Sequence, residues 1–108
     1  MFNHEKLNCY QMALDLTKGV PDLVRRWPCD LSDQLKRAAS SIVLNIAEGN
    51  AKVHPRDRRR FFVIALGSLN ECAAIMDIAM AYQLIGNELC NDIKLKLFTI
   101  LKMLYKLH

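Results

Sequence analysis

The stretch QLKRAASSIVLNIAEGNAKVHPRDRRR, residues 34–60, combines an amphipathic helical pattern, a glycine and a dense run of arginines. Apolar side chains recur at spacings of three and four residues through its first half, which predicts a helix with one buried face. This inner face comprises Leu31, Leu35, Ala38, Ile42 and Ile46. Asp30 or Ser32 is expected to cap the start of the helix, and Gly49 is expected to end it.

A line of polar side chains runs beside this apolar face. Ser41, Asn45 and Glu48 lie about one helical turn apart, so they share one side of the helix. Two interpretations are open: a solvent-exposed face, or a hydrogen-bonded contact between helices that fixes their register. We group Ser68 and Glu71 of the following segment with them as a structural polar motif. A single carboxylate without a partner acid, base or nucleophile is a poor active site, so we assign no catalysis to this motif.

A longer helix follows the glycine. It is predicted to begin at Pro55, which suits the first helical position, and to continue to Leu84 or Ile85 before Gly86. At 1.5 Å per residue, its roughly thirty residues would span ~45 Å. Apolar residues occupy most of its circumference, so the helix must be covered on more than one side. Self-association is the simplest cover for the side that a single bundle core leaves open.

The segments that flank these two are helical as well. Their spacing indicates a first helix from Asn3 to Trp27-Pro28, and Pro21 predicts either a kink near residues 17–20 or a break into two short helices. Apolar residues three and four apart after Asn87 predict the last helix, with its lysines on the solvated side. Short loops and the lack of strand alternation therefore predict an all-α, antiparallel up-down four-helix bundle as one domain.

Length and composition are typical of an ordered helical protein. The 108 residues are 52% hydrophobic and 24% charged, which suits a single packed core. No apolar run approaches the ~20 residues that cross a bilayer, and no signal peptide is visible, so we expect a cytoplasmic protein. The four cysteines and three histidines are widely spaced, so neither a metal site nor a disulfide framework is expected.

The excess positive charge is concentrated in residues 52–60. This window holds five cations and Asp57, whereas the remainder of the chain is neutral. The cations are Lys52, Arg56, Arg58, Arg59 and Arg60. Most fall at the start of the long helix, where the dipole is already positive, so the cluster indicates a bound anion. Arginine forks match phosphate, and we expect a nucleic-acid backbone as the ligand, with Lys36 and Arg37 as weaker candidates. A solvated face or salt bridges between subunits are the alternatives.

No catalytic motif is present in the sequence. It has no glycine-rich phosphate loop and no nucleophile with a plausible base. Glu71 and Asp77 are six residues apart and no Glu-x-x-His pair exists, which excludes a carboxylate di-iron bundle. We therefore expect a non-enzymatic protein without a cofactor.

Several motifs together resemble a known family. They are residues 34–42 (QLKRAASSI), 45–49 (NIAEG), Phe61 or Phe62, 65–71 (ALGSLNE) and the pair Trp27-Pro28. The pattern covers nearly the whole chain and resembles the small four-helix bundle proteins that are often encoded in intervening sequences of bacterial 23S rRNA genes. That family is similar to the accessory variability determinant protein of diversity-generating retroelements, which forms a five-fold ring and binds nucleic acid and a reverse transcriptase. The resemblance implies a four-helix bundle and a homopentameric ring, but no established activity.

Two functions are consistent with the charge pattern and the resemblance. The first is a homo-oligomer, a pentamer by the resemblance, that binds an RNA or DNA backbone through residues 52–60. The second is a protein-interaction scaffold whose cations contact an acidic partner such as a reverse transcriptase or a ribosomal component. Salt-dependent binding favours the first, and a complex that survives nuclease treatment favours the second.

Overall fold

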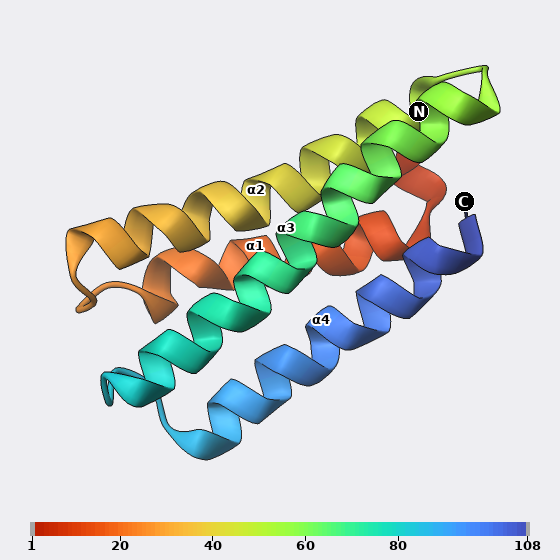
Figure 1. The fold of residues 1–108 in the computed structure, drawn as a ribbon. Coiled ribbons are helices and arrows are strands. Elements are labelled where there is room, and N and C mark those ends of the chain that lie inside the picture. The colour runs from red at the N-terminus through yellow and green to blue at the C-terminus, as the bar shows by residue number, and fades with distance from the viewer. Residues whose placement is uncertain (1, 108) are drawn as a thin grey trace.

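The computed structural model describes residues 2–107, which form an elongated bundle of four long helices (Figure 1). A short 3₁₀ turn, η1, covers Asn3–Lys6; α1 covers Asn8–Leu23, α2 Cys29–Ala51, α3 Pro55–Ala81 and α4 Asn87–Leu107. Successive helices run in opposite directions, and the described part of the chain has no strand. The bundle measures 44 × 21 × 21 Å. The prediction of an all-α four-helix bundle is confirmed.

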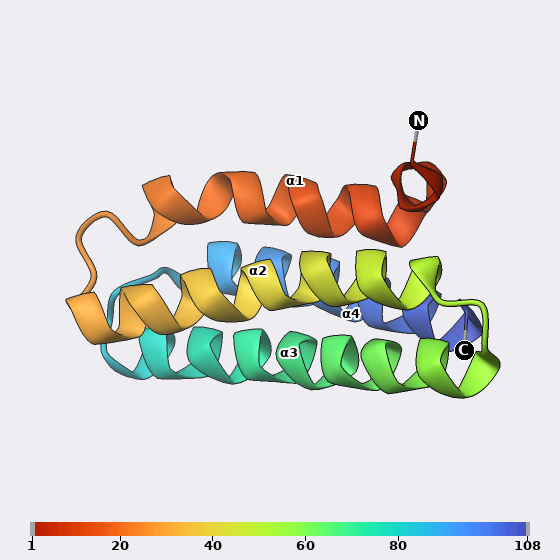
Figure 2. The same ribbon diagram turned by 90° about the horizontal axis from the view of Figure 1, so that it is seen from above.

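The core lies where the inner faces of the four helices meet. α2 and α3 pack against each other along most of their length, and α2 lies between α1 and α3 in the view of Figure 2. The predicted inner face of α2 is buried throughout: Leu31, Leu35, Ala38, Ile42 and Ile46. Among the largest fully buried side chains of the other helices are Phe62, Leu69, Met76, Ile100 and Leu104. Complete burial of a large apolar side chain is worth ~1.5–3 kcal/mol, so these faces hold the bundle together.

The start of α2 differs from the prediction. Its first residue is Cys29 and Pro28 occupies the N-cap position, so neither Asp30 nor Ser32 caps the helix. The carbonyl oxygen of Pro28 accepts a hydrogen bond of 3.0 Å from the Ser32 amide. Ser32 is buried in the first turn, while Asp30 places a negative charge near the positive end of the helix dipole.

Gly49 does not end α2, which continues to Ala51. The glycine is buried and its backbone is not left-handed. A Cβ atom added to it would lie 2.6 Å from Cε1 of Phe62 and 3.2 Å from the carbonyl oxygen of Arg58. The predicted C-terminal stop is therefore wrong, because the close approach of α3, and not a turn, requires glycine at this position.

α1 is continuous through Pro21 and shorter than predicted. The helix starts at Asn8 rather than directly after Asn3, because η1 precedes it, and it ends at Leu23. Pro21 falls in the last turn, where its missing N–H removes only one late hydrogen bond, so the alternative of a break into two helices is wrong. Trp27 lies beyond the helix in a turn and is buried.

α3 ends before the predicted Leu84 or Ile85. Gln83 adopts a left-handed backbone with φ of 60°, and the Leu84 amide donates to the Ala79 carbonyl at 2.8 Å. This hydrogen bond closes the helix early and turns the partly buried Leu84 and Ile85 onto the core. Gly86, the expected stop, has no left-handed backbone angle.

α3 presents apolar side chains outward as well as inward. Val63, Ile64 and Ile78 remain exposed on this helix, and Tyr82 is exposed at its C-cap. Within residues 2–107, α3 is the one helix whose length and composition would suit a membrane span, with 44% of its most apolar window buried in the bundle. The helix meets this criterion although no uninterrupted apolar run in it approaches ~20 residues, because its charges are few and dispersed. Length and composition alone do not distinguish a membrane span from a core helix.

Candidate nucleic-acid interface

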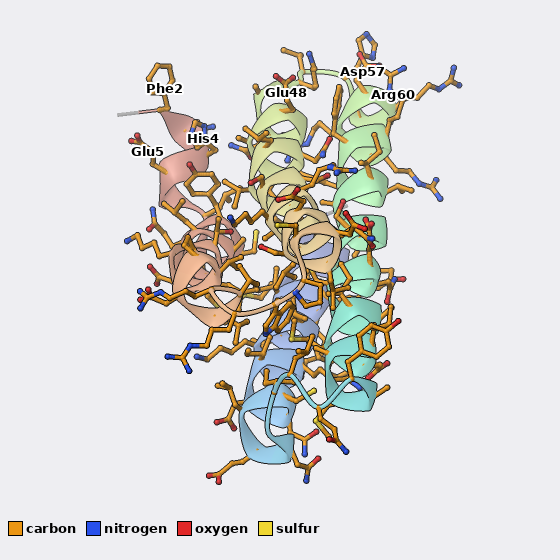
Figure 3. All side chains as sticks on the ribbon, turned by 90° about the vertical axis from the view of Figure 1, so that its left-hand side faces the viewer. Phe2, His4, Glu5, Glu48, Asp57 and Arg60 are labelled. Carbon is orange, nitrogen blue, oxygen red and sulfur yellow. The ribbon has the colours of Figure 1, made fainter. Side chains whose placement is uncertain are left out.

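The cationic residues of the window 52–60 lie at one end of the bundle, around the turn that joins α2 to α3 (Figure 3). Residues 52–54 connect the two helices, and Pro55 occupies the first position of α3. The amides of Arg56 and Asp57 lack intrahelical acceptors because they lie in the first turn, and the His54 side chain does not cap the helix. This helix start therefore presents hydrogen-bond donors and the positive end of the dipole.

Arg58 differs from its neighbours because its side chain serves the fold. It is partly buried, and its Nη1 donates a hydrogen bond of 3.1 Å to the carbonyl oxygen of Asn50. That carbonyl belongs to the last turn of α2, where helix carbonyls lack partners and the dipole is negative. The Arg58 guanidinium carbon also lies 5.3 Å from the centroid of the Phe62 ring. Arg58 thus caps α2 from α3, and this role competes with its predicted role in nucleic-acid binding.

Arg56, Arg59 and Arg60 are exposed and share the outer side of α3, since they lie three and four residues apart. Within residues 2–107, none of the ion pairs includes these three side chains. In Figure 3, Arg60 extends away from the bundle. Guanidinium groups without a carboxylate partner are available to bind an external anion in a bidentate manner.

Lys52 and Arg60 meet on one aromatic ring. The Lys52 Nζ lies 5.2 Å and the Arg60 guanidinium carbon 5.3 Å from the centroid of Phe61. Lys52 also lies 3.5 Å from a carboxylate oxygen of Glu48, one turn earlier in the chain. The sequence carries no signal for this contact, because only the fold of the turn brings Lys52 to the ring. We define the basic tip as Lys52, Arg56, Arg59 and Arg60.

Lys36 and Arg37 do not join the basic tip. Both are exposed on α2, and Arg37 lies about 21 Å from the end of this helix at 1.5 Å per residue. They line an open hollow together with Asp33, whose carboxylate offsets part of their charge. These two cations form a separate and weaker candidate site for phosphate.

Three members of the polar motif meet between α2 and α3. The hydroxyl oxygens of Ser41 and Ser68 are 2.7 Å apart, so one donates to the other across the helix interface. Asn45 Nδ2 donates to the carbonyl oxygen of Ser41 at 2.8 Å and to its hydroxyl oxygen at 3.0 Å. Glu48 and Glu71 do not take part, since Glu48 pairs with a lysine and Glu71 lines an exposed hollow. A specific hydrogen bond between the helices favours one register over others, which supports the second of the two interpretations.

The described part of the chain contains no cluster suited to metal binding. Among residues 2–107, no three His, Cys, Asp or Glu side chains are grouped as potential metal ligands, and all four cysteines are free thiols. Burial, reinforced by the Glu71 carboxylate, raises the pKa of the Cys72 thiol to about 12. Burial also raises the pKa of Cys9. Both thiols therefore stay protonated near neutral pH, where they are poor nucleophiles.

The bundle is similar to known proteins in sequence and in fold. A family model described as 23S rRNA-intervening sequence protein matches residues 5–106. A crystal structure from Bacteroides thetaiotaomicron VPI-5482, of a protein with unknown function from the S23 ribosomal protein family, is similar with a TM-score of 0.81 at 23% identity. The match covers 92% of this chain and 89% of that chain, so the two share a fold. No curated protein matches this sequence. The chain belongs to the 23S rRNA-intervening sequence protein family.

Proposed function

We propose that this protein is a non-enzymatic homo-oligomer that binds the phosphate backbone of RNA or DNA through its basic tip. The observation that carries the proposal is the exposure of Arg56, Arg59 and Arg60, which have no ion-pair partner among residues 2–107. Phosphate oxygens match the guanidinium fork, and contacts to the backbone require no reading of bases.

The position of these arginines on α3 supports an anionic ligand. A cation near a helix N-terminus is unfavourable by roughly 0.3–1 kcal/mol at low ionic strength, because that end of the dipole is already positive. Asp57 is the acidic residue in the first turn of α3, and it offsets this repulsion only in part. A phosphate at the helix start would relieve the remaining repulsion and accept hydrogen bonds from the free amides.

Self-association is proposed from the outer side of α3. Val63, Ile64, Ile78 and Tyr82 leave apolar surface exposed there, and burial of such surface is worth ~25 cal/mol per Å². The resemblance to the five-fold ring of the accessory variability determinant makes a homopentamer the proposed assembly. A ring would display several basic tips, so weak contacts from each chain would combine on one nucleic-acid polymer.

Fluorescence anisotropy with a labelled single-stranded RNA tests the proposal. The basic tip allows about four phosphate contacts per chain, so log K should fall with log salt with a slope of about −3 for each chain engaged. Arg59→Glu combined with Arg60→Glu should lower the affinity by about tenfold or more. Lys36→Glu combined with Arg37→Glu makes the same charge change away from the tip and should lower it less. An RNA affinity that does not change with salt concentration, or equal losses of affinity for the two double variants, would contradict the proposal.

An acidic protein, such as a reverse transcriptase or a ribosomal component, is the competing occupant of the basic tip. Affinity capture from a lysate before and after nuclease treatment distinguishes the two ligands. A protein partner that stays bound after nuclease treatment, and is lost with Arg59→Glu and Arg60→Glu, would replace nucleic acid as the proposed ligand.

A further inference from the structure

An apolar groove of about 410 Å³ lies between α1 and α4. The two helices come close near η1 and diverge toward the opposite end of the bundle (Figure 1). The groove lies toward that opposite end, against residues 15–23 of α1 and residues 89–97 of α4. Its floor consists of buried side chains of α2, α3 and α4, namely Leu35, Ala39, Cys72, Met76 and Leu97. On the α1 side, Gly19 leaves space, since nothing lies within 4 Å of its Cβ position. Pockets of roughly 300–1,000 Å³ with apolar walls hold small molecules.

The groove is too small to enclose a helix of another chain. A helix with its side chains is about 10–12 Å wide and rises 5.4 Å per turn, so one turn fills roughly 500 Å³. A space of about 410 Å³ accommodates less than one such turn. The apolar outer side of α3, which suits contact with a second copy, is a different surface. A small amphiphile can therefore place its whole alkyl chain in this space, whereas a helix could insert only part of one face.

The mouth of the groove carries two carboxylates and one ammonium group, and only the ammonium group is without a partner among residues 2–107. Asp15 and Asp22 border the groove, but each is paired with a cation on the same side of the bundle. The Asp15 carboxylate lies 3.4 Å from Lys18 Nζ. The Asp22 carboxylate lies 2.6 Å from Nη2 of Arg25. Lys96, on the α4 side, has no hydrogen-bond or ion-pair partner among residues 2–107. An ammonium group beside apolar surface complements a carboxylate that carries an alkyl chain.

We propose that this groove binds one medium-chain fatty acid anion, with the alkyl chain on the apolar floor and the carboxylate on Lys96. The site lies toward the opposite end of the bundle from the basic tip, so it is independent of nucleic-acid binding. Decanoate should bind with a Kd on the order of 10–100 µM, because its alkyl chain is short and the ion pair at the mouth is partly solvated.

Isothermal titration of the full chain with decanoate, below its micelle concentration, tests the proposal. Gly19→Leu should fill the groove and weaken binding by about tenfold or more while the protein stays folded, because the new side chain enters open space and leucine favours helix. Gly67→Leu is the matched control: this helical glycine also faces open space but lies outside the groove, so binding should not change. Lys96→Gln should weaken decanoate binding about three- to tenfold and leave binding of decanol unchanged.

Several results would overturn the proposal. The absence of saturable heat up to about 1 mM decanoate, or equal affinity of the Gly19→Leu and Gly67→Leu variants, would remove the site. An equal effect of Lys96→Gln on decanoate and decanol would remove the role of the carboxylate. A change of oligomer mass in Gly19→Leu relative to the unsubstituted protein, measured by light scattering, would assign the groove to a contact between copies.

Discussion

The α2–α3 pair and the α1–α4 pair each place a glycine beside the space between helices, and the two glycines have opposite surroundings. Gly49 on α2 is buried, and the ring of Phe62 occupies the space that a side chain would need. Gly19 on α1 is exposed and borders the open groove. The lack of a side chain therefore permits close contact in one pair and leaves space in the other. A glycine within a helix can mark either a packed interface or a hollow.

The close contact at Gly49 supports the end of the bundle that carries the basic tip. Phe62 fills the space beside the glycine, and Arg58 lies over the Phe62 ring and caps Asn50 at the end of α2. The turn between the helices is thereby held by packing on its inner side, which leaves its outer arginines available to a ligand. Between α1 and α4, by contrast, the side chains described for residues 2–107 leave an open groove.

The largest expected effect comes from removing the ring that fills the space beside Gly49. Phe62→Ala should lower the free energy of unfolding by about 3–5 kcal/mol, because Phe62 is fully buried and its loss leaves a cavity. Phe61→Ala is the matched control, and it should cost clearly less because that ring is only partly buried. Urea unfolding followed by circular dichroism measures both values. Comparable losses of stability for Phe62→Ala and Phe61→Ala would show that the contact of Phe62 with Gly49 adds nothing beyond what a partly buried ring contributes.

Alanine at the two glycines should change stability in opposite directions. Gly49→Ala should destabilise the fold by about 1–3 kcal/mol, because its methyl group would lie 2.6 Å from the Phe62 ring. Gly19→Ala should stabilise it by about 0.5–1 kcal/mol, since the site is open and alanine favours helix. Thermal unfolding of both variants measures the difference. Combining Gly49→Ala with Phe62→Leu should recover part of the loss, and strict additivity would refute the contact.

A smaller contrast is expected between two adjacent arginines of α3. Arg58→Gln should lower the free energy of unfolding by about 1–2 kcal/mol, because it loses the charged hydrogen bond to Asn50 and the contact with Phe62. Arg59→Gln should change stability by less than about 0.5 kcal/mol but should weaken RNA binding. Urea unfolding and anisotropy on the same two variants separate the roles. A loss of stability at Arg59 with none at Arg58 would reverse the assignment.

The helices were more predictable than their ends. Periodicity indicated four helices and the buried face of α2, because spacing of three and four residues reflects one side of a helix. The end of α2 was misplaced because Gly49 is selected by contact with Phe62, and the end of α3 because Leu84 turns onto the core. Both depend on residues from other segments, which no local pattern contains.

The candidate site was predictable in composition but not in division of roles. The window 52–60 was recognisable from its charge, but the sequence alone did not predict that Arg58 and Arg59 have different roles. Adjacent residues point about 100° apart on a helix, and the packing of α3 against α2 decides which of them faces inward. The same limit applied to the polar motif, where Ser41 contacts Ser68 while Glu48 stays at the surface.

The sequence by itself determined the helical periodicity and the concentration of positive charge in residues 52–60, because both are properties of residues within a turn or two of one another. Only the tertiary structure decided that Gly49 receives the ring of Phe62, that Arg58 caps α2, and that Gly19 borders an open groove. The physical reason is that these features depend on the distance between helices, which is set by packing of side chains from segments far apart in the chain.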